Sequence, residues 1–160
     1  MLPTDPASAG ATRPVAARPP ALAAYGVEKT FPGGHRALAG VDLAVYAGET
    51  VALVGESGSG KTTLLRLFNR TVEPSAGDVR FGGEPVAGQD PIALRRRIGY
   101  VQQEGGLIPH WPVARNVELV PKLLGWDSAR RAVRGREMLA LVGLDPDAFA
   151  GRYSRWLSGG

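Results

Sequence analysis

One short stretch of the chain combines the residue types and the spacing that phosphate binding requires. It reads GESGSGKT, from Gly55 to Thr62, and matches the pattern of a glycine, any four residues, Gly-Lys and then Ser or Thr. The glycines at positions 55, 58 and 60 allow backbone conformations that a side chain would block, so that successive N–H groups can point inward at phosphate oxygens. The spacing therefore predicts a phosphate-binding loop.

The end of this loop adds charge and a metal ligand. A helix that begins at Gly60 would direct the positive end of its dipole at the same phosphate. We expect Lys61 to reach the β- and γ-phosphates of a nucleotide, and the hydroxyl of Thr62 to ligate Mg²⁺. The predicted nucleotide-binding residues of this stretch are Gly55, Glu56, Ser57, Gly58, Ser59, Gly60, Lys61, Thr62 and Thr63.

The residues around the loop favour a nucleotide site over a flexible Gly/Ser linker. Residues 50–55 read TVALVG, a continuous apolar run of the kind expected in a strand buried on both faces. After the loop, KTTLLRLFNR places Leu64, Leu65 and Phe68 at helical spacing. A linker would not be flanked by a strand and an amphipathic helix, so the sequence predicts a nucleotide-binding site.

Further strands are expected upstream of the loop. Residues 22–31 have the pattern of a first strand, and Pro-Gly-Gly at residues 32–34 predicts a turn. Residues 41–46, VDLAVY, alternate apolar and polar side chains as a half-buried strand does. The N-terminal part of the core is therefore expected to be rich in β-structure.

Downstream of the loop, strands give way to helices. We expect a strand near residues 78–81, a short helix that starts at Pro91 and a strand at residues 97–103, RIGYVQQ. One helix is predicted over residues 113–124. A second helix is predicted to have its N-cap at Asp127 or Ser128 and to end at Gly143. Its apolar residues are Ala132, Val133, Leu139 and Val142.

Composition excludes several classes of protein. The 160 residues, 44% hydrophobic and 21% charged, suit one globular domain, and the absence of cysteine excludes disulfides and thiolate metal sites. Neither a run of eighteen apolar residues nor a signal peptide is visible, so we expect a cytoplasmic protein. Residues 1–20, rich in Pro and Ala, are predicted to be a disordered leader.

The net charge of +4 has two interpretations. An arginine excess can mark a surface that binds nucleic acid or an anionic membrane. It can also reflect the composition of the genome, and the scattered positions of most of these charges favour this second interpretation. A nucleic-acid partner is therefore not expected.

Three segments in the same order closely resemble the ATP-binding subunit of ABC transporters. They are the region around the loop, residues 41–83, the string RRRIGYVQQEGGLIPHWPVARNV and the closing LSGG. The resemblance runs from about Leu22 to Gly160 and implies an α/β fold, the RecA-like core of a P-loop NTPase with a β-rich N-terminal part. Residues 21–103 would belong to this core and residues 104–160 to the start of a helical subdomain.

The resemblance implies roles for residues outside the loop. Phe31 stands where the family keeps an aromatic side chain that stacks on adenine; simple packing in the core is the less favoured alternative. Gln103 matches the glutamine that contacts Mg²⁺ and the attacking water and links the core to the helical subdomain. Gln102 precedes it, so the assignment could shift by one position; alternation along the expected strand favours Gln103.

The last residues resemble the start of the family's signature sequence. In the family, two copies face each other head to tail, and each signature contacts the ATP bound by its partner; here Ser158, Gly159 and Gly160 would do so. Family members continue with a buried strand, a catalytic glutamate and a histidine. The resemblance thus implies a fragment with an incomplete sheet, with no catalytic residue of its own and no ATPase activity alone.

The string ELVPKLLGW, from Glu118 to Trp126, resembles the subgroup that imports quaternary-amine osmoprotectants such as glycine betaine, choline and carnitine. The implied partners are a second ATPase subunit, membrane-spanning permease subunits and, indirectly, a solute-binding protein, with ATP and Mg²⁺ as cofactors. The expected location is peripheral, on the cytoplasmic face of the plasma membrane. A soluble ATPase of the same superfamily acting on nucleic acid or ribosomes, and a non-catalytic remnant, stay open as alternatives.

Overall fold

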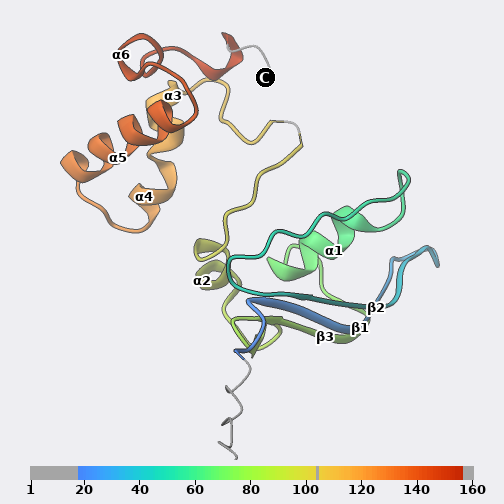
Figure 1. Cartoon of the computed structure of the whole chain (residues 1–160). Helices are drawn as coiled ribbons and strands as arrows, with labels where there is room; N and C mark the ends of the chain where they lie inside the picture. Colours follow the sequence, from blue (N-terminus) through green and yellow to red (C-terminus); the bar gives the residue numbers. More distant parts are fainter. Residues whose placement is uncertain (1–17, 104, 157–160) are drawn as a thin grey trace, which may run out of the picture. The chain divides into compact units, whose positions relative to one another are not determined.

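The computed structural model describes residues 18–103 and 105–156, and Figure 1 colours the chain along its length. The chain divides into two compact units, Met1–Pro91 and Ile92–Gly160. Residues 1–17 of the predicted leader lie outside the described residues. None of the helices in the described ranges combines the length and the apolar character needed to cross a bilayer.

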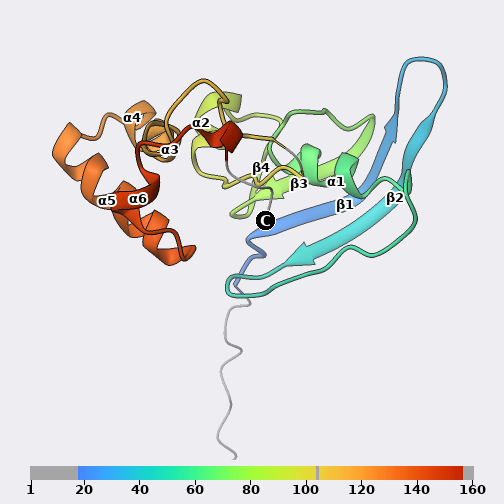
Figure 2. The ribbon, with the colours of Figure 1, turned by 90° about the horizontal axis from the view of Figure 1, so that it is seen from above.

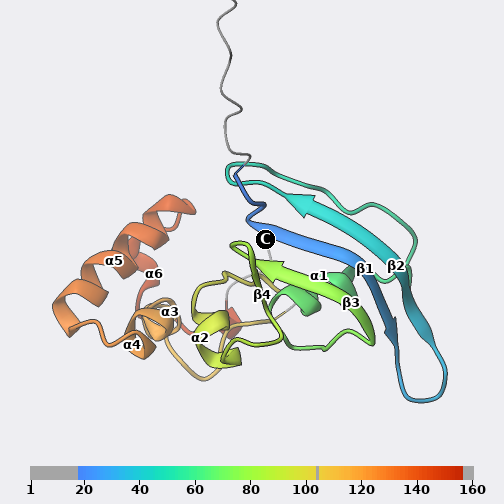
Figure 3. The same ribbon diagram turned by 90° about the horizontal axis from the view of Figure 1, so that it is seen from below.

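The first unit is built on an antiparallel sheet, seen from opposite sides in Figures 2 and 3. Its strands are β1 (Leu22–Thr30), β2 (Arg36–Val45), β3 (Ala76–Phe81) and β4 (Glu84–Pro85), in the order β2-β1-β3-β4. The expected first strand, the turn after it and the strand near residues 78–81 are confirmed, whereas β2 begins five residues before the predicted Val41.

Helix α1 (Lys61–Phe68) packs against β2 and β3. Leu64, Leu67 and Phe68 are buried, together with Ala24, Val27 and Val79 of the sheet. The predicted helical spacing is therefore correct for Leu64 and Phe68, but Leu65 is 48% exposed. The apolar face of α1 and one face of the sheet form the core of this unit, which fixes the helix that follows the predicted phosphate-binding loop.

The strands predicted at residues 50–55 and 97–103 are not formed. Val54 is 93% exposed and Val101 is 95% exposed, although an apolar strand buried on both faces was expected around Val54. A strand in a parallel sheet needs hydrogen-bonding neighbours, and within the described residues neither segment pairs with another strand. The apolar pattern of residues 50–55 is that of a strand, but the pairing that would make it one does not form within the described residues.

The end of α1 has an unusual backbone conformation. The N–H of Arg70 donates to Leu67 O at 3.1 Å and the N–H of Thr71 donates to Arg66 O at 3.0 Å, the two hydrogen bonds of a Schellman motif. Arg70 occupies the left-handed position that glycine usually takes, with φ of 53°, and is the one non-glycine residue with positive φ in the described ranges. This conformation costs an L-residue about 1–2 kcal/mol.

The second unit is helical. Its elements are α2 (Pro91–Arg96), which begins at the unit boundary, then α3 (Val113–Val117), α4 (Leu119–Leu123), α5 (Ser128–Leu141), α6 (Pro146–Phe149) and a 3₁₀ helix at Ser154–Trp156. The single helix predicted over residues 113–124 is thus two short helices. Pro121 explains the break, because a proline has no N–H to donate to the carbonyl of Val117 and fits only the first turn of a new helix.

The predicted N-cap of α5 is confirmed at Asp127, whose Oδ1 accepts a 2.9 Å hydrogen bond from the N–H of Arg130. Gly143, with φ of 76°, follows the C-terminal end of the helix as expected. The predicted apolar stripe is only partly correct: Leu139 is buried, whereas Val133 and Val142 are 60% and 68% exposed.

Candidate nucleotide-binding site

The loop from Gly55 to Thr62 joins the extended segment 50–55 to α1. Gly58 and Gly60 have φ values of 82° and 91°, in the region that favours glycine. At Gly60 a side chain is excluded for a second reason, since a Cβ atom there would collide with the carbonyl oxygen of Ala37 and lie 2.9 Å from Cδ2 of Leu38. Gly60 therefore lets the loop pack directly on the start of β2.

The side chain of Lys61 folds back on the loop. Its Nζ donates to the carbonyl oxygens of Gly55 and Glu56, at 2.8 and 2.6 Å, and to Oγ of Ser59 at 3.1 Å. These contacts use all three protons of an ammonium group. The loop therefore closes around one positive charge at the N-terminus of α1.

The same helix end offers unused donors. The N–H groups of Gly58, Gly60, Lys61 and Thr62 make no hydrogen bond within the part of the chain that the structure describes. The first turn of α1 contains no acidic residue. Free N–H groups, a helix dipole and the Lys61 ammonium together make an anion-binding arrangement. A hollow of about 440 Å³ adjoins the loop and is lined by Gly55, Ser59, Gly60 and Lys61 and by apolar residues of β2, segment 52–54 and α1.

Phe31 lies in the turn between β1 and β2, in the same unit as the loop. The turn is closed by the N–H of Phe31, which donates to His35 O at 2.9 Å, and the two rings stack with centroids 6.5 Å apart. Lys29 Nζ lies 5.1 Å from the centroid of the Phe31 ring. The ring is half-buried rather than enclosed, so core packing does not fully explain this aromatic residue.

The other predicted site residues lie elsewhere. Gln102 and Gln103 belong to the second unit, are exposed and fall outside any helix or strand. The alternation that favoured Gln103 loses its basis, because this segment is not a strand. Ser158, Gly159 and Gly160 lie outside the described residues. The roles of these five residues therefore stay predictions.

A metal ion would depend on few protein ligands. Within the described residues, no group of three or more His, Asp or Glu side chains could hold a metal ion. The hydroxyl of Thr62 is exposed in the first turn of α1, next to Lys61. A single hydroxyl oxygen suits Mg²⁺, which is usually bound by one or two protein oxygens together with phosphates and water.

Three residues near the predicted site residues were not predicted from the sequence: Lys29 next to Phe31, Ala37 against Gly60, and Arg70 after the end of α1. Lys29 and Phe31 are two positions apart in and beside a strand, the spacing that places side chains on one face, and this signal was available. Ala37 and Arg70 carried no such signal, because their roles depend on a close backbone approach and on a left-handed conformation.

Comparison with known proteins assigns the family. Residues 38–160 match the family model described as ABC transporter. The chain belongs to the ABC transporter family. It is 47% identical over 134 residues to the choline transport ATP-binding protein OpuBA of Bacillus subtilis (strain 168), and 46% identical over 134 residues to the glycine betaine/carnitine/choline transport ATP-binding protein OpuCA of the same strain. Each alignment covers 84% of this chain but 35% of the relative, so the chain spans about a third of their length.

A solved structure confirms the fold class of this ABC transporter chain. The chain is similar to an ATP-binding cassette whose dimeric, post-hydrolysis state was solved with ADP and Pi, with a TM-score of 0.76 and 32% sequence identity. The similarity covers 86% of this chain and 63% of that cassette. The predicted incomplete α/β P-loop NTPase fold and the predicted resemblance to quaternary-amine import ATPases are therefore confirmed.

Proposed function

We propose that this chain binds the triphosphate of ATP through the loop Gly55–Thr62 and belongs to the ATPase subunit of an importer for quaternary-amine osmoprotectants. The observation that carries the proposal is the closure of this loop around the ammonium of Lys61 at the N-terminus of α1. The alternative of a soluble ATPase acting on nucleic acid is not favoured, because the relatives are named as transport proteins.

Each loop residue has a role in this proposal. Phosphate oxygens accept hydrogen bonds from the unused N–H groups of Gly58, Gly60 and Lys61, and the remaining loop residues, Glu56, Ser57, Ser59 and Thr63, line the nucleotide. The ammonium of Lys61 exchanges its contacts with Gly55 and Glu56 for the β- and γ-phosphates. A positive charge at this place stabilises the negative charge on the transferred phosphoryl group.

Mg²⁺ would be held by the Thr62 hydroxyl, together with phosphate oxygens and water. The ion supplies charge neutralisation at the β- and γ-phosphates. The adenine ring would stack on Phe31. The turn that contains Phe31 leads into β2, and Gly60 of the loop lies against Ala37 at the start of β2. Ser158, Gly159 and Gly160 would contact the nucleotide of a second ATPase subunit in a head-to-tail dimer, a proposal supported by the dimeric state of the similar cassette.

The surface formed by residues 118–126 supports a permease partner. Val120, Leu123 and Leu124 are 54%, 55% and 45% exposed, and exposed apolar residues that lie together favour a protein interface. Arg131 of α5 holds this segment: its Nη1 donates to Trp126 O at 2.6 Å and its Nε lies 3.5 Å from a carboxylate oxygen of Glu118.

We therefore propose that residues 118–126 dock on the membrane-spanning subunits and that the chain acts peripherally on the cytoplasmic face of the membrane. A solute-binding protein would deliver the quaternary amine to those subunits. In this scheme the closure of two ATP-loaded subunits and their reopening after hydrolysis drive transport.

The proposal is tested by titrating the purified 160-residue chain with MgATP in a calorimeter and by assaying phosphate release. We expect one saturable site for MgATP and, as the family resemblance implies, no hydrolysis above background. Turnover by the chain alone would contradict this assignment of residues, and an absence of binding would contradict the proposed function.

A further inference from the structure

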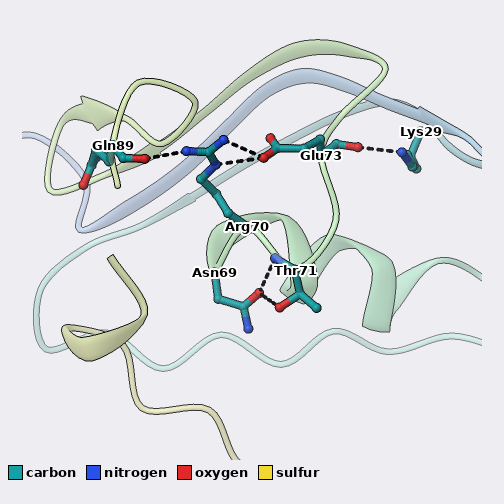
Figure 4. A network of polar contacts seen from close by, with 6 residues as sticks. All are labelled: Lys29, Asn69, Arg70, Thr71, Glu73 and Gln89. Atoms are coloured by element: carbon teal, nitrogen blue, oxygen red, sulfur yellow. Dashed lines mark hydrogen bonds and ion pairs between the residues drawn. The ribbon is translucent and has the colours of Figure 1, made fainter. Parts of the chain in front are cut away.

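Arg70 links the C-terminal end of α1 to its surroundings through every nitrogen of its guanidinium group (Figure 4). Nε and Nη2 lie 2.9 and 2.7 Å from Oε1 of Glu73, and Nη1 donates to Gln89 O at 2.5 Å. The side chain of Arg70 is 16% exposed and that of Glu73 is 52% exposed, so the contact with Gln89 is partly buried and the ion pair with Glu73 faces solvent. The left-handed backbone of Arg70 is therefore offset by contacts that a glycine could not make.

The contacts continue from Glu73 into β1. Lys29 Nζ donates to the carbonyl oxygen of Glu73 at 2.7 Å, and the same ammonium lies 5.1 Å from the centroid of the Phe31 ring. An ammonium near an aromatic ring is attracted by the negative face of its π-system. A continuous series of contacts thus runs from the end of α1 through Glu73 and Lys29 to Phe31, all within the first unit.

We propose that Arg70 is a positioning residue that, through Glu73 and Lys29, holds Phe31 in place for a nucleotide base. The proposal rests on the proposed function, since it takes Phe31 as the stacking residue and the loop before α1 as the phosphate site. Helix α1 carries Lys61 at one end and Arg70 just beyond the other. Arg70 therefore couples the element that binds phosphates to the ring that binds the base.

The physical effect of this link is preorganisation. A ring that is already held in the bound orientation loses less conformational freedom when a base stacks on it, so binding is tighter without any new contact to the ligand. Breaking the link would weaken only the part of the affinity that depends on the base. Phosphate binding at Gly55–Thr62 would be retained.

Two variants separate this role from a general structural one. In Arg70→Gly the guanidinium is lost, but the left-handed backbone becomes favourable, so the protein is expected to fold. In Lys29→Met the ammonium is lost and a side chain of similar length is kept. Arg80→Met is the matched control, because Arg80 also binds a carboxylate in this unit, that of Asp78 at 2.6 Å, but has no contact with Phe31.

The measurement is the affinity of each variant for MgATP and for magnesium tripolyphosphate, which has the phosphates but no base. We expect Arg70→Gly and Lys29→Met each to weaken MgATP binding by about fivefold and to leave tripolyphosphate binding within about twofold of the wild type. The double variant should bind MgATP no more weakly than the single variant with the lower affinity, since the two substitutions break the same series of contacts.

An equal loss for both ligands, or an unchanged ratio of the two affinities, would overturn the proposal while leaving the proposed function intact. If the wild type bound neither ligand, the proposed function itself would fail, and this inference with it. Arg80→Met should bind both ligands as the wild type does, and a base-specific loss in this control would also overturn the proposal.

Discussion

The ammonium of Lys61 lies 2.8 Å from the carbonyl oxygen of Gly55, six residues earlier in the chain. This hydrogen bond closes the loop, and it places a positive charge among N–H groups at the start of α1. In the proposed function, nucleotide binding would require the Lys61 ammonium to exchange its hydrogen-bond partners rather than the whole loop to become ordered, and ordering would cost conformational entropy.

The first prediction concerns Thr62 and the metal ion. Replacing its hydroxyl in Thr62→Val should abolish the gain in ATP affinity that Mg²⁺ produces, because the proposed protein ligand in the first turn of α1 is lost. The measurement is ATP affinity with Mg²⁺ and with EDTA. Thr50→Val, an exposed threonine before the loop, should keep the full magnesium effect. An unchanged magnesium effect in Thr62→Val would remove Thr62 from the metal site.

The second prediction compares two glycines of the loop. Both Gly58 and Gly60 have positive φ, but a Cβ atom at Gly58 would meet nothing within 4 Å, whereas at Gly60 it would collide with Ala37. Gly58→Ala should therefore cost about 1–2 kcal/mol through backbone strain alone. Gly60→Ala should cost clearly more, since backbone atoms must also move. Urea denaturation measures both, and equal losses would show that the loop does not pack on β2 as described.

The third prediction concerns acid and the cap of α5. The pKa of Asp127 is lowered from its ordinary value of 3.8, first because the carboxylate accepts a hydrogen bond from the Arg130 amide. A carboxyl with a lowered folded-state pKa contributes stability above the unfolded value, and this contribution is lost as pH falls through the folded value. The helical circular-dichroism signal should therefore weaken below pH 3.8.

Asp127→Asn isolates this effect from the other carboxyl groups, including Asp147, whose pKa is lowered by its hydrogen bond with Arg136. Asparagine caps helices nearly as well as aspartate but does not titrate. The difference in stability between wild type and variant should hence shrink or reverse below pH 3.8. Parallel curves over the whole acid range would show that the Asp127 charge adds nothing to its cap.

The fourth prediction concerns base stacking on Phe31. Phe31→Ala should weaken MgATP binding by about five- to 150-fold, since stacking of a base on an aromatic side chain contributes about 1–3 kcal/mol. Phe31→Tyr should bind ATP as the wild type does, because either ring presents a π-face. Affinities for tripolyphosphate serve as the reference for folding. A loss in Phe31→Ala that is the same for both ligands would assign the ring to core packing.

The elements that sequence alone predicted correctly depend on local chemistry. The cap at Asp127, the turn after Thr30 and the glycine after α5 each rest on hydrogen bonds or φ angles within a few residues. Residues 50–55 were predicted as a strand because of their composition, yet pairing decides whether a strand forms, and pairing depends on distant residues. Val54 is accordingly exposed, although the composition of this segment predicted a buried strand.

Some residues of the candidate site could likewise be predicted from local sequence patterns, and others could not. Lys61 and the glycines were predicted from spacing alone; the structure brings them together in one closed loop, and their role in phosphate binding stays a prediction. Pro121 was itself a local signal for the break between α3 and α4, but the apolar residues on both sides of it favoured one continuous helix. Arg70 could not have been found, since no pattern in the sequence indicates an arginine at the left-handed position of a Schellman motif.

The most direct test of the account is MgATP binding by the Lys61→Ala variant, with Lys122→Ala as the matched control. Lys122 is an exposed lysine of the second unit, outside the loop. We predict that Lys61→Ala weakens binding about a hundredfold or more, as expected for the loss of a charge aimed at the phosphates, and that Lys122→Ala binds as the wild type does. Equal affinity of Lys61→Ala and wild type would contradict the assignment of this loop as the phosphate site.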